Sequence, residues 1–268
     1  MLIIENQLQA EPRNYRYVMI ISLIVLLLFV WSLSTVNMQN MSEGGWLIAS
    51  NILRGLLSPD VGLLFNLTSQ GVAYLLIETI SIALLGTLLG SILAIPLAFL
   101  SASNVVPKPV ALLTRIFLIF IRTVPALVYG LMFIRVTGPG PFAGVLTISL
   151  VSIGMLAKLY VDAIGNLDTS VFESMTSLGC STLEKIRYGI IPQLFSIFLS
   201  IMIYRFDMNL RDAAVLGLVG AGGIGAPLIF AMNSYRWSEV GSILIGLVIL
   251  ILMVEWFSNR IRAKLVNG

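Results

Sequence analysis

Long apolar stretches, separated by short polar breaks, run along most of the chain. A helix needs roughly 20 mostly apolar residues to cross a bilayer, and Val18–Val36 is an uncharged run of that length. Breaks such as NVVPKP and TGPGP divide the rest of the chain into further runs. The pattern predicts an all-α membrane protein with about six transmembrane helices, at Val18–Val36, Tyr74–Ser101, Leu112–Ile134, Phe142–Ile164, Ile190–Met208 and Val240–Phe257.

The composition supports a lipid environment and excludes several kinds of chemistry. Hydrophobic residues make up 58% of the chain and charged residues only 11%, about half the charged share of a soluble domain. Histidine is absent and Cys180 is the single cysteine, which excludes histidine acid–base chemistry, internal disulfides and a His/Cys zinc site. We therefore expect no catalytic residue, no bound cofactor and no metal. Lysine and arginine are scattered and the net charge is +3, so nucleic acid is not an expected partner.

The cations that flank the apolar runs predict the orientation in the membrane. Lysine and arginine are enriched in short cytoplasmic loops, and most of them fall inside if the N-terminus is cytoplasmic, as Arg13 and Arg16 suggest. We therefore predict that both termini lie in the cytoplasm. WLIASNILRGLL in the external loop is predicted to be a short amphipathic helix, at the interface or covering the bundle. The predicted parts are a cytoplasmic segment, a first span, an external loop and a core, at residues 1–17, 18–36, 37–71 and 72–268.

A polar segment, ESMTSLGCSTLEKIRYGIIP, separates the fourth and fifth apolar runs. Ser170-x-x-Glu173 and Ser181-x-x-Glu184 each match a capping box, which predicts two short helices with Gly179 at the change of direction. Apolar residues at helical spacing give each helix a face that docks in a partner's groove or packs under the bundle. The residues alone leave both readings open. The apolar positions are Phe172, Met175, Leu178, Leu183 and Ile186, and Pro192 is predicted to begin the fifth span.

Charged residues at membrane depth are costly and tend to face a cavity or a partner. An arginine fork suits an oxyanion, so Arg205 and Arg211 are candidates for the translocation pathway together with Asp207. However, Asp207 and Arg211 are four residues apart and these charges, with Asp212, sum to zero. We favour ion pairing over direct contact with a substrate. The same spacing predicts a helix-stabilising pair at Lys158 and Asp162, whereas Glu78, Arg122 and Glu255 have no predicted partner.

A run of glycines follows the charged residues. In a helix each glycine costs about 1 kcal/mol relative to alanine, and irregular backbone at this depth is tolerated only where protein or water surrounds it. Leu216–Pro227 is therefore predicted to be a re-entrant loop or gate. Close helix packing, which Gly86-x-x-x-Gly90 also suggests, is the alternative. Gly217 precedes the predicted gate residues Gly220, Gly222, Gly223 and Gly225.

The polar segment resembles the EAA signature of ABC-transporter permeases, E-A-A-x-x-x-G followed by nine residues and I-x-L-P. Glu173, Gly179 and Pro192 stand at the matching positions, with departures at neighbouring residues such as Ser174 and Gly189. The resemblance implies a MetI-like importer permease fold, in which residues from about 168 to 188 form coupling helices that dock on a separate ATPase subunit. The implied coupling residues are Phe172, Glu173, Met175, Leu178, Gly179, Leu183 and Pro192.

From about Thr79 onward, GPGPFAGVL, KIRYGIIPQ, YRFDMNLRDAAVLGLVGAGGIG and RIR resemble the permease subunit of bacterial phosphonate importers. This resemblance implies transport of phosphonate, or phosphite, across the bacterial inner membrane. It also implies a homodimer, two ATP-binding subunits that hold ATP and Mg, and an extracytoplasmic substrate-binding protein. No lysine lies in a G-x-x-x-x-G-K-[ST] motif, so ATP hydrolysis is expected elsewhere. A methionine or glycine-betaine permease, a secondary anion carrier and a membrane-embedded enzyme remain alternatives.

Overall fold

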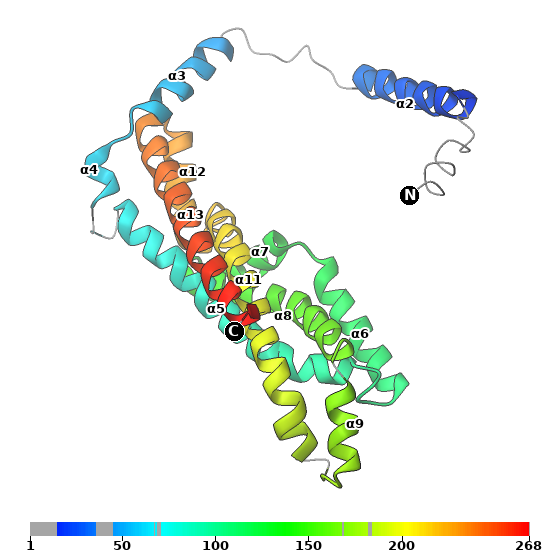
Figure 1. The fold of residues 1–268 in the computed structure, drawn as a ribbon. Coiled ribbons are helices and arrows are strands. Elements are labelled where there is room, and N and C mark those ends of the chain that lie inside the picture. The colour runs from blue at the N-terminus through cyan, green and yellow to red at the C-terminus, as the bar shows by residue number, and fades with distance from the viewer. Residues whose placement is uncertain are drawn as a thin grey trace. The chain divides into compact units, whose positions relative to one another are not determined.

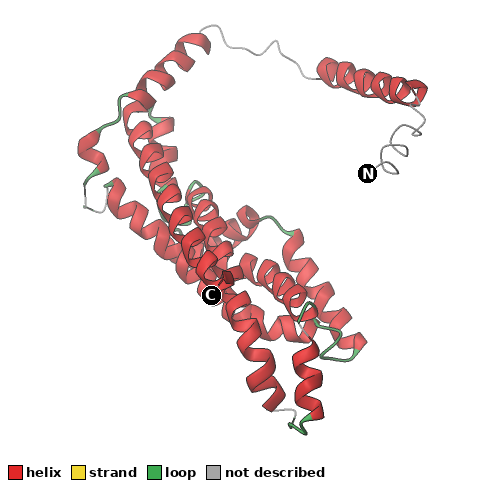
Figure 2. Ribbon diagram, in the orientation of Figure 1, coloured by secondary structure: helices red, strands yellow, loops and turns green. Residues whose placement is uncertain are grey.

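The computed structural model describes residues 15–35, 45–66, 68, 71–167, 169–181 and 184–267, and every regular element within them is helical (Figure 2). The chain divides into two units, Met1–Ser50 and Asn51–Gly268. The first unit contains α2 (Tyr15–Thr35), which has no buried residue. It confirms the first predicted helix, although Val36 lies outside the described residues. Helix α3 (Gly45–Leu57) begins in this unit and continues into the second.

The second unit is a bundle built around three helices that contact one another, α5, α8 and α11 (Figure 1). Helices α6 and α7 pack on α8, and α13 packs on α11 and α5. Five helices of the described chain are long and apolar enough to cross a membrane, or six if α6 and α7 together count as one span. The elements are α4 (Val61–Leu64), α5 (Val72–Ser101), α6 (Lys108–Thr123), α7 (Ala126–Thr137), α8 (Pro141–Gly165), α9 (Thr169–Ser177), a π-helical turn (Lys185–Ile190), α11 (Ile191–Gly217), α12 (Gly225–Asn233) and α13 (Trp237–Asn267).

Glycines bring α5 and α8 into close contact. A Cβ atom added at Gly86 would lie 2.6 Å from the Ile148 side chain, and one at Gly90 would lie 2.7 Å from Ser152 Cβ. Both distances are shorter than real contacts allow, so the two helix axes approach more closely than larger residues would permit. The predicted packing role of Gly86-x-x-x-Gly90 is confirmed for this helix pair, since small residues at such spacing favour close helix association in membranes.

The third predicted span, Leu112–Ile134, is wrong as a single helix. Helix α6 ends at Thr123, α7 begins at Ala126, and the two are bent by 84°. Pro125 has no N–H to donate to the Ile121 carbonyl four residues earlier, and its ring opposes a continuous helix. The Tyr129 hydroxyl donates to that carbonyl instead, at 3.1 Å. The bend is therefore stabilised because a side chain supplies the hydrogen bond that the backbone lacks.

The predicted external loop contains helices that pack on α13. The amphipathic helix predicted at WLIASNILRGLL is present as part of α3. A Cβ at Gly55 would lie 2.1 Å from Trp237 Cβ, so α3 and α13 touch there. Ser238 donates to the Ser58 carbonyl at 2.7 Å, and Ser242 donates to the Asp60 carbonyl at 3.0 Å. Of the two predicted roles, lying at the membrane interface or covering the bundle, these contacts favour covering the bundle for the part of α3 after Ser50.

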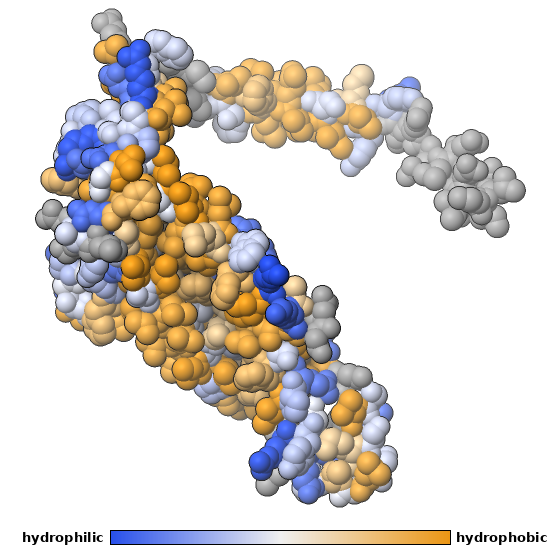
Figure 3. Space-filling view, turned by 60° about the vertical axis from the view of Figure 1, so that its left-hand side comes forward, coloured by the Kyte–Doolittle hydropathy of each residue, from blue (hydrophilic) through white to orange (hydrophobic). Residues whose placement is uncertain are grey.

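The surface of the bundle fits a bilayer. Apolar side chains cover the middle of the face in Figure 3, and hydrophilic residues gather toward its ends. Large apolar side chains are exposed along the long helices, for example Ile92 on α5 and Leu252 on α13. A soluble monomer rarely exposes so continuous an apolar surface, so the bundle is suited to lipid. The orientation of the termini stays a prediction.

Candidate functional site

The polar segment after α8 forms a hairpin that extends beyond the rest of the bundle together with the start of α11 (Figure 1). Helix α9 ends in a Schellman motif. The Cys180 N–H donates to the Met175 carbonyl and the Gly179 N–H to the Thr176 carbonyl, both at 3.0 Å. Gly179 has φ of 78°, a left-handed conformation that glycine adopts without steric penalty. The predicted role of Gly179 in reversing the chain is confirmed.

The second capping box forms, but it does not begin a separate helix. The Ser181 N–H and hydroxyl donate to the Glu184 carboxylate at 2.8 and 2.7 Å, and the Glu184 N–H donates to the Ser181 hydroxyl at 3.4 Å. The hydroxyl and backbone bonds lower the pKa of the Glu184 carboxyl group below its ordinary value. At the first box, α9 begins at Thr169, one residue before Ser170.

The predicted second short helix is instead a π-helical turn, Lys185–Ile190, that runs directly into α11. Pro192 lies in the first turn of α11, as predicted, and cannot donate a backbone hydrogen bond. A wider turn just before a proline accommodates its ring and the missing bond. The Gln193 side-chain amide donates to the Gly189 carbonyl four residues earlier, at 2.9 Å.

The predicted coupling residues point in different directions. Leu178 is 81% exposed at the tip of the hairpin, and Glu173 is also exposed. Met175 faces inward, because a Cβ at Gly189 would lie only 3.0 Å from its sulfur. The Phe172 side chain and Leu183 lie outside the described residues. Leu178 is therefore the apolar coupling residue that the described hairpin presents most openly.

The glycine-rich loop between α11 and α12 is held by side chains from α5. The Glu78 carboxylate accepts a hydrogen bond from the Gly223 N–H at 2.8 Å, and the Thr79 hydroxyl accepts one from the Ile224 N–H at 3.0 Å. The Gly140 N–H at the start of α8 donates to the Gly220 carbonyl at 2.9 Å. Sequence reasoning left Glu78 without a role and missed Thr79, because these contacts join residues about 145 positions apart.

The loop requires glycine at several positions. Gly220, Gly222 and Gly223 have φ of 95°, 82° and 71°, and such conformations disfavour side chains. A Cβ at Gly222 would lie 2.6 Å from Pro141 backbone atoms, and one at Gly225 would lie 2.3 Å from the Ala214 carbonyl oxygen. The irregular backbone predicted after Leu216 is therefore present, and it is tightly packed. Its role as a gate stays a prediction.

The charged residues of α11 form ion pairs. Arg211 lies 3.2 Å from Asp207 and 3.5 Å from Glu255 of α13, and Arg205 lies 3.4 Å from Asp212. The predicted pairing of Asp207 with Arg211 is confirmed. Because α11 continues to Gly217, the cluster lies within this helix and not at its end. Ion pairing reduces the charge that these arginines offer to an anion, while their role in the pathway stays a prediction.

Asn209 links the three central helices. Its side chain is fully buried and donates to the Thr87 hydroxyl of α5 at 2.7 Å and to the Ser152 hydroxyl of α8 at 2.8 Å. A buried amide between two hydroxyls fixes the relative rotation of the helices, because leaving it unpaired in the core would be costly. Sequence reasoning missed this role. The available signal was an amide residue within the charged stretch from Arg205 to Asp212.

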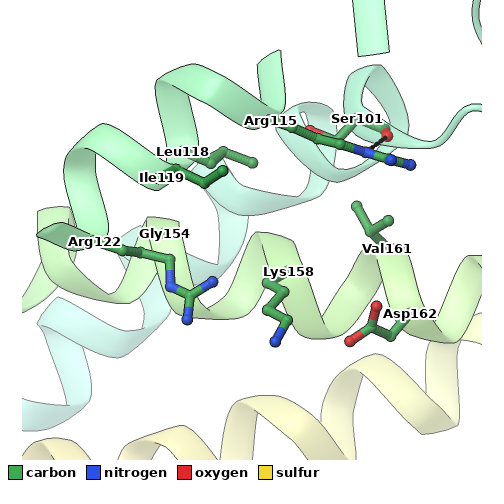
Figure 4. Close-up of a pocket in the computed structure, with 9 residues that line it drawn as sticks. All are labelled: Ser101, Arg115, Leu118, Ile119, Arg122, Gly154, Lys158, Val161 and Asp162. Carbon is green, nitrogen blue, oxygen red and sulfur yellow. Dashed lines mark hydrogen bonds between the residues drawn. The ribbon is translucent and has the colours of Figure 1, made fainter. Parts of the chain in front are cut away.

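A cleft between α6 and α8 is lined by three cations, Arg115, Arg122 and Lys158 (Figure 4). Its volume is about 320 Å³. The predicted pair of Lys158 and Asp162 is wrong, since no ion pair joins these residues among the described contacts. The lining residues are Ser101, Arg115, Leu118, Ile119, Arg122, Gly154, Lys158, Val161 and Asp162.

Comparisons with known proteins agree on one family. The family model described as "Binding-protein-dependent transport system inner membrane component" matches residues 86–265. The chain is 36% identical over 197 residues to the phosphate-import permease protein PhnE of Mycolicibacterium smegmatis, covering 73% of this chain and 37% of the relative. It is 32% identical over 188 residues to the phosphite transport system permease protein PtxC of Stutzerimonas stutzeri, covering 70% and 68%. The chain thus spans little more than a third of the first relative's length.

Solved structures share the fold. A chain of an amino acid ABC transporter matches with a TM-score of 0.60 at 23% identity, covering 73% of this chain and 95% of that chain. A chain of the MetNI methionine ABC transporter in an inward-facing conformation matches with a TM-score of 0.63 at 17% identity, covering 74% and 99%. The helical bundle, the hairpin and the matched family model together show that the chain belongs to the inner membrane components of binding-protein-dependent transport systems, a family of non-catalytic ABC-transporter permeases.

Proposed function

We propose that the chain is the permease subunit of an ATP-driven importer that carries a phosphonate, or a related oxyanion such as phosphite, across the bacterial inner membrane. The observation that carries the proposal is the similarity to relatives named for phosphate, phosphite and phosphonate transport. The assembly would contain two copies of this chain, two ATP-binding subunits that hold ATP and Mg, and an extracytoplasmic substrate-binding protein. The hairpin end of the bundle and both termini would face the cytoplasm.

The hairpin supports coupling to an ATPase subunit. Leu178 projects from a reversal whose backbone is fixed by the Schellman motif, and the Ser181 hydroxyl donates to the Glu184 carboxylate just before the π-helical turn. An exposed apolar residue at a fixed reversal of the chain suits insertion into a partner's groove. Because the π-helical turn leads directly into α11, movement of the docked hairpin would be passed to the centre of the bundle.

Replacement of Leu178 by glutamate tests this coupling. We expect ATP-dependent uptake to fall by at least roughly tenfold, since a buried anchor at an interface contributes about 2 kcal/mol or more. The ATPase subunit should also dissociate more readily during purification. Val105→Glu is the matched control, because Val105 is also an exposed apolar residue but lies on the loop between α5 and α6. Normal uptake by the Leu178→Glu complex would contradict the proposed docking.

The substrate class is tested with the complete transporter and its own binding protein. We expect methylphosphonate or phosphite to bind the protein, to stimulate ATP hydrolysis and to accumulate in proteoliposomes. Methionine and glycine betaine are the comparison substrates, because related importers of these compounds carry a similar glycine-rich loop. Transport of methionine or betaine with no response to any phosphorus oxyanion would overturn the substrate assignment while leaving the permease assignment intact.

A further inference from the structure

The cleft between α6 and α8 holds more positive charge than its surroundings neutralise. Arg115, Arg122 and Lys158 line it together with one carboxylate, that of Asp162. Arg115 is engaged, because its guanidinium donates to the Ser101 carbonyl at 2.9 Å and to the Ser103 hydroxyl at 3.3 Å. Among the described contacts, Arg122 and Lys158 make no hydrogen bond or ion pair. Two cations are therefore available to a ligand.

These side chains are arranged along the length of the bundle. Gly154, Lys158 and Asp162 follow one another at four-residue spacing on α8, which extends over about 12 Å of helix. Arg115 and Arg122 are separated by two turns of α6, or about 10 Å. Arg122, Lys158 and Asp162 lie in a row along α8 in Figure 4. The charges thus run from the end of α5 at Ser101 toward the bend between α6 and α7.

The contact between α6 and α8 fixes the position of the Arg122 side chain. A Cβ at Gly154 would lie 2.6 Å from Arg122 Cγ, so the arginine stem rests on the backbone of α8 where a side chain is missing. This contact directs the guanidinium along α8 toward Lys158 (Figure 4). Arg122 also precedes Val124–Pro125, where the helix bends by 84°, so a change in the bend would move it.

Lipid tails are an unfavourable environment for the charged side chains of this cleft. The side chains of Arg122 and Lys158 are exposed in the protomer, and an unpaired charge facing hydrocarbon is strongly unfavourable. They must therefore face water, a partner or an anion. In contrast, the arginines of α11 already have carboxylate partners within 3.5 Å. The cleft is the better site for an anion because its charge is not already neutralised.

We propose that this cleft binds a phosphorus oxyanion in transit, with Arg122 and Lys158 as its ligands. The inference rests on the proposed function, which supplies the anion. A guanidinium and an ammonium together suit the oxygens of phosphonate or phosphate, and a cleft of about 320 Å³ is large enough for a small anion of this class. The carboxylate of Asp162 limits the positively charged part of the cleft lining on α8. An anionic phospholipid headgroup offers the same chemistry, so the test must separate the two sources.

Uptake and ATP hydrolysis are measured with the complete transporter in proteoliposomes. We expect Arg122→Gln and Lys158→Gln each to lower methylphosphonate uptake roughly tenfold, since one hydrogen bond to a charged group has about this effect on affinity. ATP hydrolysis stimulated by the loaded binding protein should persist. Arg122→Lys should retain part of the uptake, and Arg260→Gln is the control that removes an exposed cation outside the cleft. Wild-type uptake by the double variant would overturn the proposal.

A second measurement does not depend on turnover. Val161→Cys in a Cys180→Ser background places a single thiol in the cleft, and its rate of modification by a charged thiol reagent is followed with and without methylphosphonate or inorganic phosphate. Protection by the free anion in neutral-lipid liposomes supports the proposal. Protection only by phosphatidylglycerol, or by neither, overturns it. If the wild-type transporter moves no phosphorus oxyanion, the proposed function fails, whereas the thiol measurement still tests the cleft.

Discussion

Alanine at Gly222 should damage the glycine-rich loop much more than alanine at Gly220. Both glycines have positive φ, 82° and 95°, so each substitution carries a conformational penalty of about 1–2 kcal/mol. At Gly220 the nearest atom to the new Cβ is 3.7 Å away, which is an ordinary contact. At Gly222 the new Cβ lies 2.6 Å from Pro141 backbone atoms. The start of α8 must then move by roughly 0.8 Å, and overpacking of this kind adds about 1–3 kcal/mol.

We therefore expect Gly222→Ala to lower the free energy of unfolding by about 2–5 kcal/mol and Gly220→Ala by about 1–2 kcal/mol. The two variants should be compared by thermal unfolding in detergent and by uptake in the assembled transporter. Gly222→Ala should also lose uptake, because the shift reaches the Glu78 carboxylate, 3.1 Å from the new Cβ. Equal destabilisation of the two variants would refute the reasoning, since it would mean that the contact with Pro141 carries no weight.

Three further predictions concern hydrogen bonds. Tyr129→Phe leaves the Ile121 carbonyl without its donor and should lower the free energy of unfolding by about 1 kcal/mol, measured by thermal unfolding. An unchanged stability would show that the bend does not need the hydroxyl. Asn209→Ala removes two buried hydrogen bonds and should lower the free energy of unfolding by about 1–3 kcal/mol, measured by denaturant titration. An unchanged free energy of unfolding would contradict the linking role of Asn209 and would mean that the three helices repack. The pKa of the Glu184 carboxyl group is lower when the hairpin is folded. The contribution of this carboxylate to the stability of the hairpin is therefore complete above the ordinary pKa of 4.5 and is lost as the pH falls through the folded pKa. A fluorophore on Cys180 should report this loosening, and Ser181→Ala should weaken the pH dependence, because it removes the hydroxyl bond and keeps the backbone bond to the carboxylate.

The positions of the long helices could be predicted because a bilayer requires a long apolar run. Val72–Ser101 and Pro141–Gly165 differ from the predicted spans by no more than two residues at either end. Pro125 indicates where the third span could bend, but the size of the bend could not be predicted, because proline is tolerated in membrane helices and the angle depends on packing. Tyr129 supports that bend from the neighbouring helix, and the apolar pattern carries no sign of this contact.

Candidate site residues were predictable only where the chemistry is local. The roles of Gly179, Ser181 and Glu184 follow from turn and capping rules that act within a few residues. The pair of Lys158 and Asp162 was predicted from helical spacing, but spacing brings only the Cβ atoms together, and the side chains turn into a shared cleft instead. Contacts across the fold, such as that of Glu78 with the glycine-rich loop, depend on how distant helices pack.

Helix α11 joins two ends of the bundle as a single continuous rod. It has 27 residues, which corresponds to a length of about 40 Å. Pro192 and the hairpin stand at one end, and Gly217 with the glycine-rich loop stands at the other. If such a rod pivots about the buried amide of Asn209, it works as an unequal lever, because the hairpin arm is about 26 Å long and the loop arm about 12 Å. A push on the hairpin would then reach the loop as a displacement about half as large and in the opposite direction, with a correspondingly greater force.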